Sequence, residues 1–113
     1  MRRANAGDAK AQLDLADAYF EGKEGGKNEA LAMSYLRKAA NQRLARAQFE
    51  MGEHLSHDPY PDYAKAYMWY TLAQRNGDKH SKKALKELMA KMTPEQQQAG
   101  QDLADTWKPS SPK

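Results

Sequence analysis

The sequence offers one candidate metal site. His54 and His57 stand three residues apart, Asp58 follows them, and Glu50 precedes His54 by four residues. On a helix, residues at these spacings lie on one face, so their side chains could converge on an ion. A zinc site needs three or four ligands with supporting hydrogen bonds, and no glutamate lies between the histidines as in a metalloprotease. We favour the alternative interpretation, a polar helix end that runs into a loop, and predict no metal and no cofactor.

A run of basic residues is the second candidate. It comprises Lys79, His80, Lys82, Lys83 and Lys86, within a predicted helix over 79–91. Such a run could bind the phosphates of a polyanion or nucleic acid. The following segment carries Glu95, Asp102 and Asp105, so pairing across a helical hairpin, or a solvated face, is the favoured interpretation. The net charge of +3 is too small to predict nucleic-acid binding by itself.

The aromatic residues could form a stacking platform for sugars or bases. At helical spacing, however, Trp69 and Tyr70 are predicted to be core residues that bridge neighbouring units. The repeat pattern does not assign Tyr60, Tyr63 and Tyr67 to the core or to the surface. The chain contains no cysteine, no serine in a nucleophile elbow and no phosphate-binding loop, so we predict that it is not an enzyme.

Two sequence patterns each occur twice in the chain. The pattern Ala9-x-Ala11-Gln12-x-x-Leu15-Ala16-x-x-Tyr19 returns 36 residues later as Ala45-x-Ala47-Gln48-x-x-Met51-Gly52-x-x-Leu55. The pattern Ala32-x-x-Tyr35-Leu36-x-x-Ala39 returns 34 residues later as Ala66-x-x-Trp69-Tyr70-x-x-Ala73. A period of this length that contains two helical patterns is typical of helix–turn–helix solenoids, whose units bury their apolar faces against each other.

The predicted elements are therefore helices. They cover about 9–21, 29–42, 45–56, 63–76 and 79–91, and a sixth begins at Pro94. Thr93 and Gln96 provide its capping box, and Ala99, Leu103 and Trp107 its apolar face. Many of the apolar residues are alanines, which favour helix and let helices approach closely. We predict an all-α, right-handed α-α superhelical solenoid of antiparallel helix pairs with a C-terminal capping helix.

The repeated patterns resemble the Sel-one-like repeat, a relative of the tetratricopeptide repeat. Residues 8–43 and 44–77 resemble two repeats, 78–107 a degenerate closing unit, and 108–113 a tail, within a single domain of residues 1–113. Ala16 stands where the family prefers glycine, Leu55 replaces a tyrosine, and Pro59 and Pro61 change the second loop.

The repeat register leaves two interpretations of the chain's start. Residues 3–6 align with the end of a second helix, as in the C-terminal part of a longer array; the alternative is a native start with a short leader. No signal peptide or membrane span is visible, and a chain without cysteine fits cytosol and periplasm alike. The compartment stays unknown.

The resemblance implies an adaptor or scaffold, often bacterial, that binds a protein or peptide on the concave face of its first helices. By analogy with tetratricopeptide repeats, that face would include Lys10, Leu13, Asp17, Phe20, Arg46, Phe49, Glu53, His57 and Lys83. The alternative for Leu13 and Phe49 is packing into neighbouring helices. Two other functions stay open: a metal-dependent hydrolase-like factor using His54 and His57, and polyanion binding through helix 79–91. Weak self-association through the N-terminal edge is a further expectation.

Overall fold

The computed structural model describes residues 8–22, 28–57 and 61–108, and all regular structure in these residues is α-helical. The six helices are α2 (Ala9–Glu21), α3 (Glu29–Asn41), α4 (Ala45–His57), α5 (Tyr63–Arg75), α6 (Ser81–Met89) and α7 (Pro94–Thr106). The predicted helices are thus confirmed, with bounds that differ by one or two residues. None of them is long and apolar enough to cross a membrane. Asp58, Pro59 and Tyr60 lie outside the described residues.

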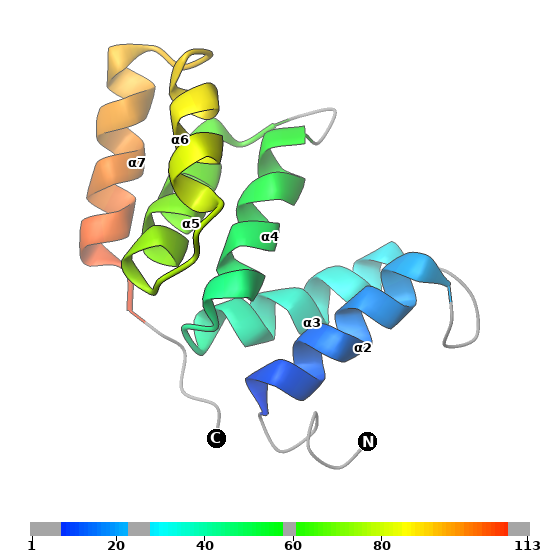
Figure 1. Cartoon of the computed structure of the whole chain (residues 1–113). Helices are drawn as coiled ribbons and strands as arrows, with labels where there is room; N and C mark the ends of the chain where they lie inside the picture. Colours follow the sequence, from blue (N-terminus) through cyan, green and yellow to red (C-terminus); the bar gives the residue numbers. More distant parts are fainter. Residues whose placement is uncertain (1–7, 23–27, 58–60, 109–113) are drawn as a thin grey trace.

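The helices form two antiparallel hairpins followed by a closing pair (Figure 1). Helix α2 packs against α3, and α4 packs against α5, while α3 also contacts α4. Both α6 and α7 pack mainly against α5 and touch each other little. The result is an elongated helical repeat solenoid with extents of 43 × 28 × 21 Å.

Local sequence signals set the starts of these helices. Asp8, Asn28 and Asp62 each precede a helix, and the side chain of each accepts a hydrogen bond from a backbone N–H three residues later, at 3.0, 3.0 and 3.1 Å. Thr93 and Gln96 form the predicted capping box at the start of α7. Each cap satisfies backbone N–H groups that have no partner inside the helix.

The same left-handed turn ends both repeats. Arg43 and Gly77, which are 34 residues apart, have φ of 67° and 98°, after α3 and α5 respectively. Glycine adopts this conformation without steric cost, whereas a side chain at Arg43 is strained there. This turn directs each repeat into the next.

A small residue lets the two helices of each repeat approach closely. Gly52 of α4 lies against the ring of Tyr70, which is 1% exposed, in α5. The equivalent positions of the first repeat are Ala16 and Leu36, both fully buried in one core cluster. Glycine is thus found opposite the tyrosine ring in the second repeat, and alanine is found where the first repeat has a leucine. This difference explains why Ala16 departs from the glycine that the family prefers.

A hydrogen-bonded amide pair with one buried glutamine recurs in both repeats. The Gln48 Oε1 accepts a hydrogen bond from the Asn76 side chain at 2.9 Å, and the Gln12 Oε1 accepts one from the Gln42 side chain at 2.6 Å. Gln48 also donates to the carbonyl oxygen of Ala40, at 3.1 Å, in the preceding repeat. Gln48 therefore links the two repeats through polar contacts inside the core.

The last helix covers α5 with a different face from the one predicted. Gly100 and Ala104 are its buried residues, and a Cβ on Gly100 would lie 2.7 Å from the Tyr67 ring and its Cβ. Leu103 is 37% exposed and Ala99 is also exposed, so the prediction that they pack inward is wrong. The small residues allow the closest approach of the helices, and that contact turns Leu103 towards solvent.

Trp107 does serve as an anchor of this cap, as predicted. Its ring meets that of Trp69 edge-on, with centroids 5.9 Å apart. Trp69 is 5% exposed and belongs to the core cluster that joins the repeats. Its predicted burial is confirmed.

Candidate functional site

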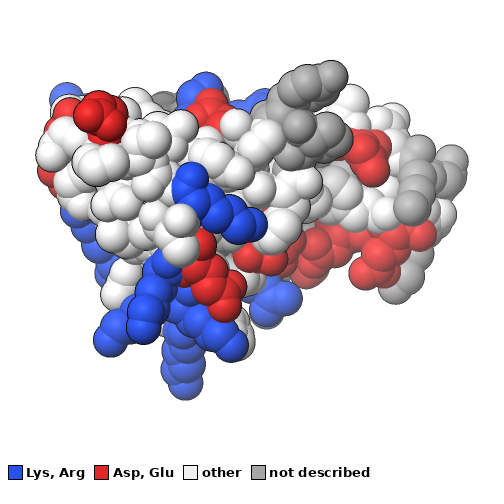
Figure 2. All heavy atoms as spheres, turned by 90° about the horizontal axis from the view of Figure 1, so that it is seen from above, with Lys and Arg blue, Asp and Glu red and all other residues white. Residues whose placement is uncertain are grey.

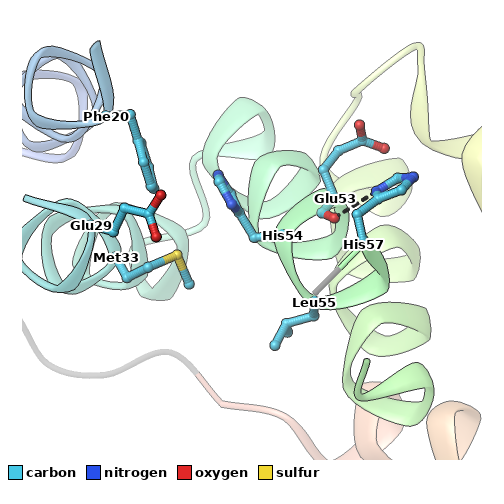
Figure 3. Close-up of a pocket in the computed structure, with 7 residues that line it drawn as sticks. All are labelled: Phe20, Glu29, Met33, Glu53, His54, Leu55 and His57. Carbon is cyan, nitrogen blue, oxygen red and sulfur yellow. Dashed lines mark hydrogen bonds between the residues drawn. The ribbon is translucent and has the colours of Figure 1, made fainter. Parts of the chain in front are cut away.

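A groove of about 520 Å³ opens where the far ends of the first two hairpins face each other. We call it the tip groove, and Figure 3 shows the side chains that line it: Phe20, Glu29, Met33, Glu53, His54, Leu55 and His57. They come from the end of α2, the start of α3 and the end of α4. The groove exists because the repeats pack at one end of their helices and diverge at the other (Figure 1).

One side of the tip groove is a stacked ring pair. The rings of Phe20 and His54 lie almost parallel, at 13°, with centroids 4.5 Å apart. Met33 and Leu55, both half-buried, add aliphatic surface beside them. Apolar walls that converge in this way can hold an apolar side chain of a bound segment.

The electrostatics of His54 follow from this packing. Burial lowers the pKa of its imidazole below the ordinary 6.5, although the carboxylates of Glu29, Glu53 and Asp17 oppose that shift. The His57 charge acts in the same direction as burial. Near neutral pH, His54 is therefore an uncharged ring that can stack on Phe20.

Glu53 is held on the other side of the groove by hydrogen bonds. Its carboxylate accepts a bond from the Tyr70 hydroxyl at 2.7 Å, and its backbone carbonyl oxygen lies 2.8 Å from Nδ1 of His57 (Figure 3). The Tyr70 hydroxyl is also 3.2 Å from the Ser56 Oγ. Burial in the first place, and the bond to Glu53, raise the pKa of Tyr70 far above its ordinary value, so it remains a hydrogen-bond donor.

Glu50 of α4 and Asp17 of α2 form an acidic pair between these two helices. Burial raises the pKa of the Glu50 carboxyl, and the nearby charge of Asp17 adds to the rise. Arg46 opposes it through a 3.0 Å ion pair with Glu50, although the Arg46 side chain is 65% exposed. The contact between the first helices of the two repeats thus brings two carboxyl groups together, with Arg46 as the cation beside Glu50.

The histidine pair is not arranged as a metal site within the described residues. His54 turns to Phe20, whereas His57 turns back to the end of its own helix. No group of three or more histidine, aspartate or glutamate side chains in the described ranges is placed to hold a metal ion. Asp58, which belongs to the candidate site in the sequence, lies outside those ranges.

The structure separates the predicted partner-binding residues. Phe20, Glu53 and His57 line the tip groove. Leu13 is only 8% exposed and belongs to the core, so it is not a surface anchor, and the alternative interpretation of packing into neighbouring helices holds for it. Phe49 is half-buried, with its ring 5.8 Å from those of Tyr70 and His80, as the alternative interpretation expected. Lys10, Arg46 and Lys83 are exposed and Asp17 is half-buried, all outside the groove.

Sequence reasoning missed Glu29, Met33 and Leu55 as groove residues. Met33 lies beside the apolar stripe of α3 rather than in it, and Leu55 replaces the tyrosine that the repeat pattern prefers. The apolar side chains at these two positions indicated an exposed apolar surface, because the packing of the repeat does not require them there. The position of Glu29 in the groove carries no such signal, because it depends on how the two hairpins face each other.

The lysines of α6 are solvated. Lys82, Lys83 and Lys86 are exposed, and none has an ion pair with a described residue. Asp105 of α7 instead pairs with Arg75 of α5 at 3.0 Å, and hydrogen bonds from Arg75 and Gln101 lower its pKa. The prediction of pairing between α6 and α7 is wrong because both helices pack on α5, and the prediction of a solvated face holds.

The comparison with protein families decides the identity of the fold. The sequence profile of the Sel1 repeat matches residues 9–44 and again residues 45–78. The chain belongs to the Sel1 repeat family. Sel1 repeats are generally protein–protein interaction modules, and this one has the helical repeat solenoid of the family. A search among curated proteins found no match to the chain.

Proposed function

We propose that this Sel1 repeat protein binds a segment of a partner protein, and that the tip groove is the anchor pocket for one apolar side chain of that segment. The observation that carries the proposal is the groove itself: Phe20, Met33 and Leu55 give it apolar walls, and Glu29 and Glu53 place carboxylates at its rim. Apolar anchors surrounded by polar groups are the usual composition of a peptide-binding surface.

The charges of the surface favour one kind of segment. Helix α2 is mainly acidic, since it carries three acidic residues (Asp14, Asp17 and Glu21) and one basic residue (Lys10). Helix α6 with the adjacent Lys79 is mainly basic, since it carries four lysines and one acidic residue, Glu87. In Figure 2 the clearest group of Lys and Arg projects from the lower edge of the view and the clearest group of Asp and Glu lies to its right, while residues of both signs also occur elsewhere on this face. A segment with a basic residue beside its apolar anchor would fit the acidic rim of the groove. The proposed surface extends from there over Lys10, Asp17, Arg46 and Lys83.

The affinity for a short segment should be modest. A standard interface buries about 800 Å² on each partner, and two repeats with one anchor pocket offer less. Exposed rim charges contribute chiefly to specificity and association rate.

The test is a selection of binders from a random peptide library displayed on phage, followed by calorimetry with the selected synthetic peptides. Glu29→Lys reverses a rim charge of the groove, and Asp102→Lys makes a similar change on the exposed surface of α7, away from the groove and from the proposed surface. We expect Glu29→Lys to weaken binding about three- to tenfold, from loss of one attraction and gain of a repulsion, and Asp102→Lys to change it little. Equal effects of the two variants, with unchanged melting curves, would place the binding surface elsewhere.

A further inference from the structure

A second groove, of about 270 Å³, lies beside the tip groove and differs from it in chemistry. We call it the tryptophan groove. Met51, Met68 and Trp69 are its buried residues, and Trp107 of the cap is half-buried in its lining. The two grooves share Met33 and Leu55, which form the ridge between them.

The lining of the tryptophan groove is adaptable and apolar. Met33, Met51 and Met68 have flexible, polarisable side chains that adjust to different shapes. Trp69 and Trp107 supply large aromatic surfaces, which dominate the energetics of many interfaces. The volume is slightly below the roughly 300–1,000 Å³ of small-molecule pockets, so it suits one or two side chains of a larger partner.

The charges at this groove have one sign. Arg37 from α3 and Lys65 from α5 both line it and are exposed, and no acidic side chain is among the described residues of its lining. Neither cation has an ion pair with a described residue. The tip groove, in contrast, is lined by Glu29 and Glu53, and none of the described residues in its lining is a lysine or arginine. An occupant of the tryptophan groove would therefore gain from carboxylates next to its apolar part.

From this geometry we infer that the tryptophan groove docks a protein segment in which an aliphatic anchor is flanked by aspartate or glutamate. The anchor enters between the methionines and Trp69, and the flanking carboxylates meet Arg37 and Lys65. This docking uses the second helices of the repeats, Met51 and Leu55 of α4, and the cap, and its anchor enters a different groove from the tip groove. A protein segment suits the site better than a membrane, because Trp69 is buried and Trp107 is half-buried rather than projecting as lipid-inserting wedges.

The groove carries its own reporter, because Trp69 and Trp107 are the two tryptophans of the whole chain. The probes are three synthetic peptides without aromatic residues: leucine flanked by aspartates, leucine flanked by lysines, and alanine flanked by aspartates. We expect the first to change tryptophan fluorescence saturably, and the other two to bind at least about tenfold more weakly, as loss of the anchor or reversal of the charge would cause.

Charge reversals locate the effect on the protein. Arg37→Glu and Lys65→Glu should each weaken binding of the acidic leucine peptide about three- to tenfold, and more at low salt than at high salt. Lys82→Glu, which makes the same charge change on an exposed part of α6 outside the groove, is the matched control. Circular dichroism of each variant checks that the fold is kept.

Three results would overturn the inference: equal binding of the lysine-flanked peptide, an equal loss in Lys82→Glu, or no saturable fluorescence change with the acidic peptide. Binding to vesicles of anionic phospholipid without a response to that peptide would replace the protein segment by a lipid surface. Because the probes and variants differ from Glu29→Lys and its selected peptides, failure here leaves the tip-groove proposal to its own test.

Discussion

The contact between Gly52 and Tyr70 makes a sharp prediction about stability. In Gly52→Ala, the new Cβ would lie 2.6 Å from Cδ1 and 2.7 Å from Cε1 of the Tyr70 ring. The ring cannot easily move aside, because its hydroxyl is bonded to Glu53 at 2.7 Å and the residue is 1% exposed. Helices α4 and α5 must therefore separate to accept one methyl group.

Two opposing effects set the size of the change. Alanine is favoured over glycine inside a helix by about 0.5–1 kcal/mol. Overpacking a tight core costs about 1–3 kcal/mol, and a contact this short belongs in the upper part of that range. The overpacking wins, so we expect Gly52→Ala to lose about 1–2 kcal/mol of unfolding free energy.

A second variant tests the cause. Tyr70→Leu combined with Gly52→Ala recreates in the second repeat the Ala16 and Leu36 pair of the first, where both residues are fully buried. Tyr70→Leu alone should be destabilising, because it leaves space beside Gly52 and removes the hydroxyl bond. In the double variant the methyl group fills part of that space, so its loss should be smaller than the sum of the two single losses by about 1 kcal/mol or more.

The assay is urea unfolding of the parent chain, the two single variants and the double variant, followed by far-UV circular dichroism. Their unfolding free energies are compared on the condition that the four m-values agree. The reasoning fails if Gly52→Ala is more stable than the parent chain. It also fails if the two substitutions add to within about 0.5 kcal/mol, because residues in direct contact should be coupled by more than that.

Four further changes have expected outcomes. Trp69→Ala should cost about 3–5 kcal/mol in the same urea assay, as for other buried aromatic residues, and a loss below about 1 kcal/mol would contradict its place in the core. Gln48→Ala removes one buried and one part-buried hydrogen bond and should cost about 1–3 kcal/mol. Arg43→Gly relieves a residue at φ 67° and should be neutral or raise stability by up to about 1 kcal/mol, whereas a clear loss would show that the turn is not strained. The pKa of His54 in the folded protein lies below 6.5, so the unfolded chain binds the proton more readily. The contribution of His54 to the unfolding free energy is therefore fully present above pH 6.5 and is lost as the pH falls below it. Melting temperatures measured across this range should depend less on pH in His54→Gln than in the parent chain.

The sequence by itself determined the repeat architecture. The pattern that recurs after 36 and 34 residues fixes two helical hairpins, and local signals such as Asp8, Asn28 and Thr93 mark where helices begin. These features are legible because helix periodicity and capping involve residues only a few positions apart. The burial of Trp69 followed from the same periodicity.

Tertiary packing decided which surfaces stay open. Leu13 and Phe20 occupy the same predicted face of α2, yet the first enters the core and the second lines the tip groove. Leu103 turned outward because Gly100 allows α7 to approach Tyr67 more closely on the neighbouring side. No local pattern encodes such choices, because each depends on the distance between two helices far apart in the sequence.

The two grooves are also a product of packing alone. Glu29 and His54 meet in the tip groove, and Arg37, Lys65 and Trp107 meet in the tryptophan groove, although none of these residues is close to another in its set along the chain. The repeat pattern specifies how each hairpin buries its own apolar stripe. The angle between hairpins is set by contacts such as the bond from Gln48 to the Ala40 carbonyl oxygen, and that angle determines which side chains remain available to a partner.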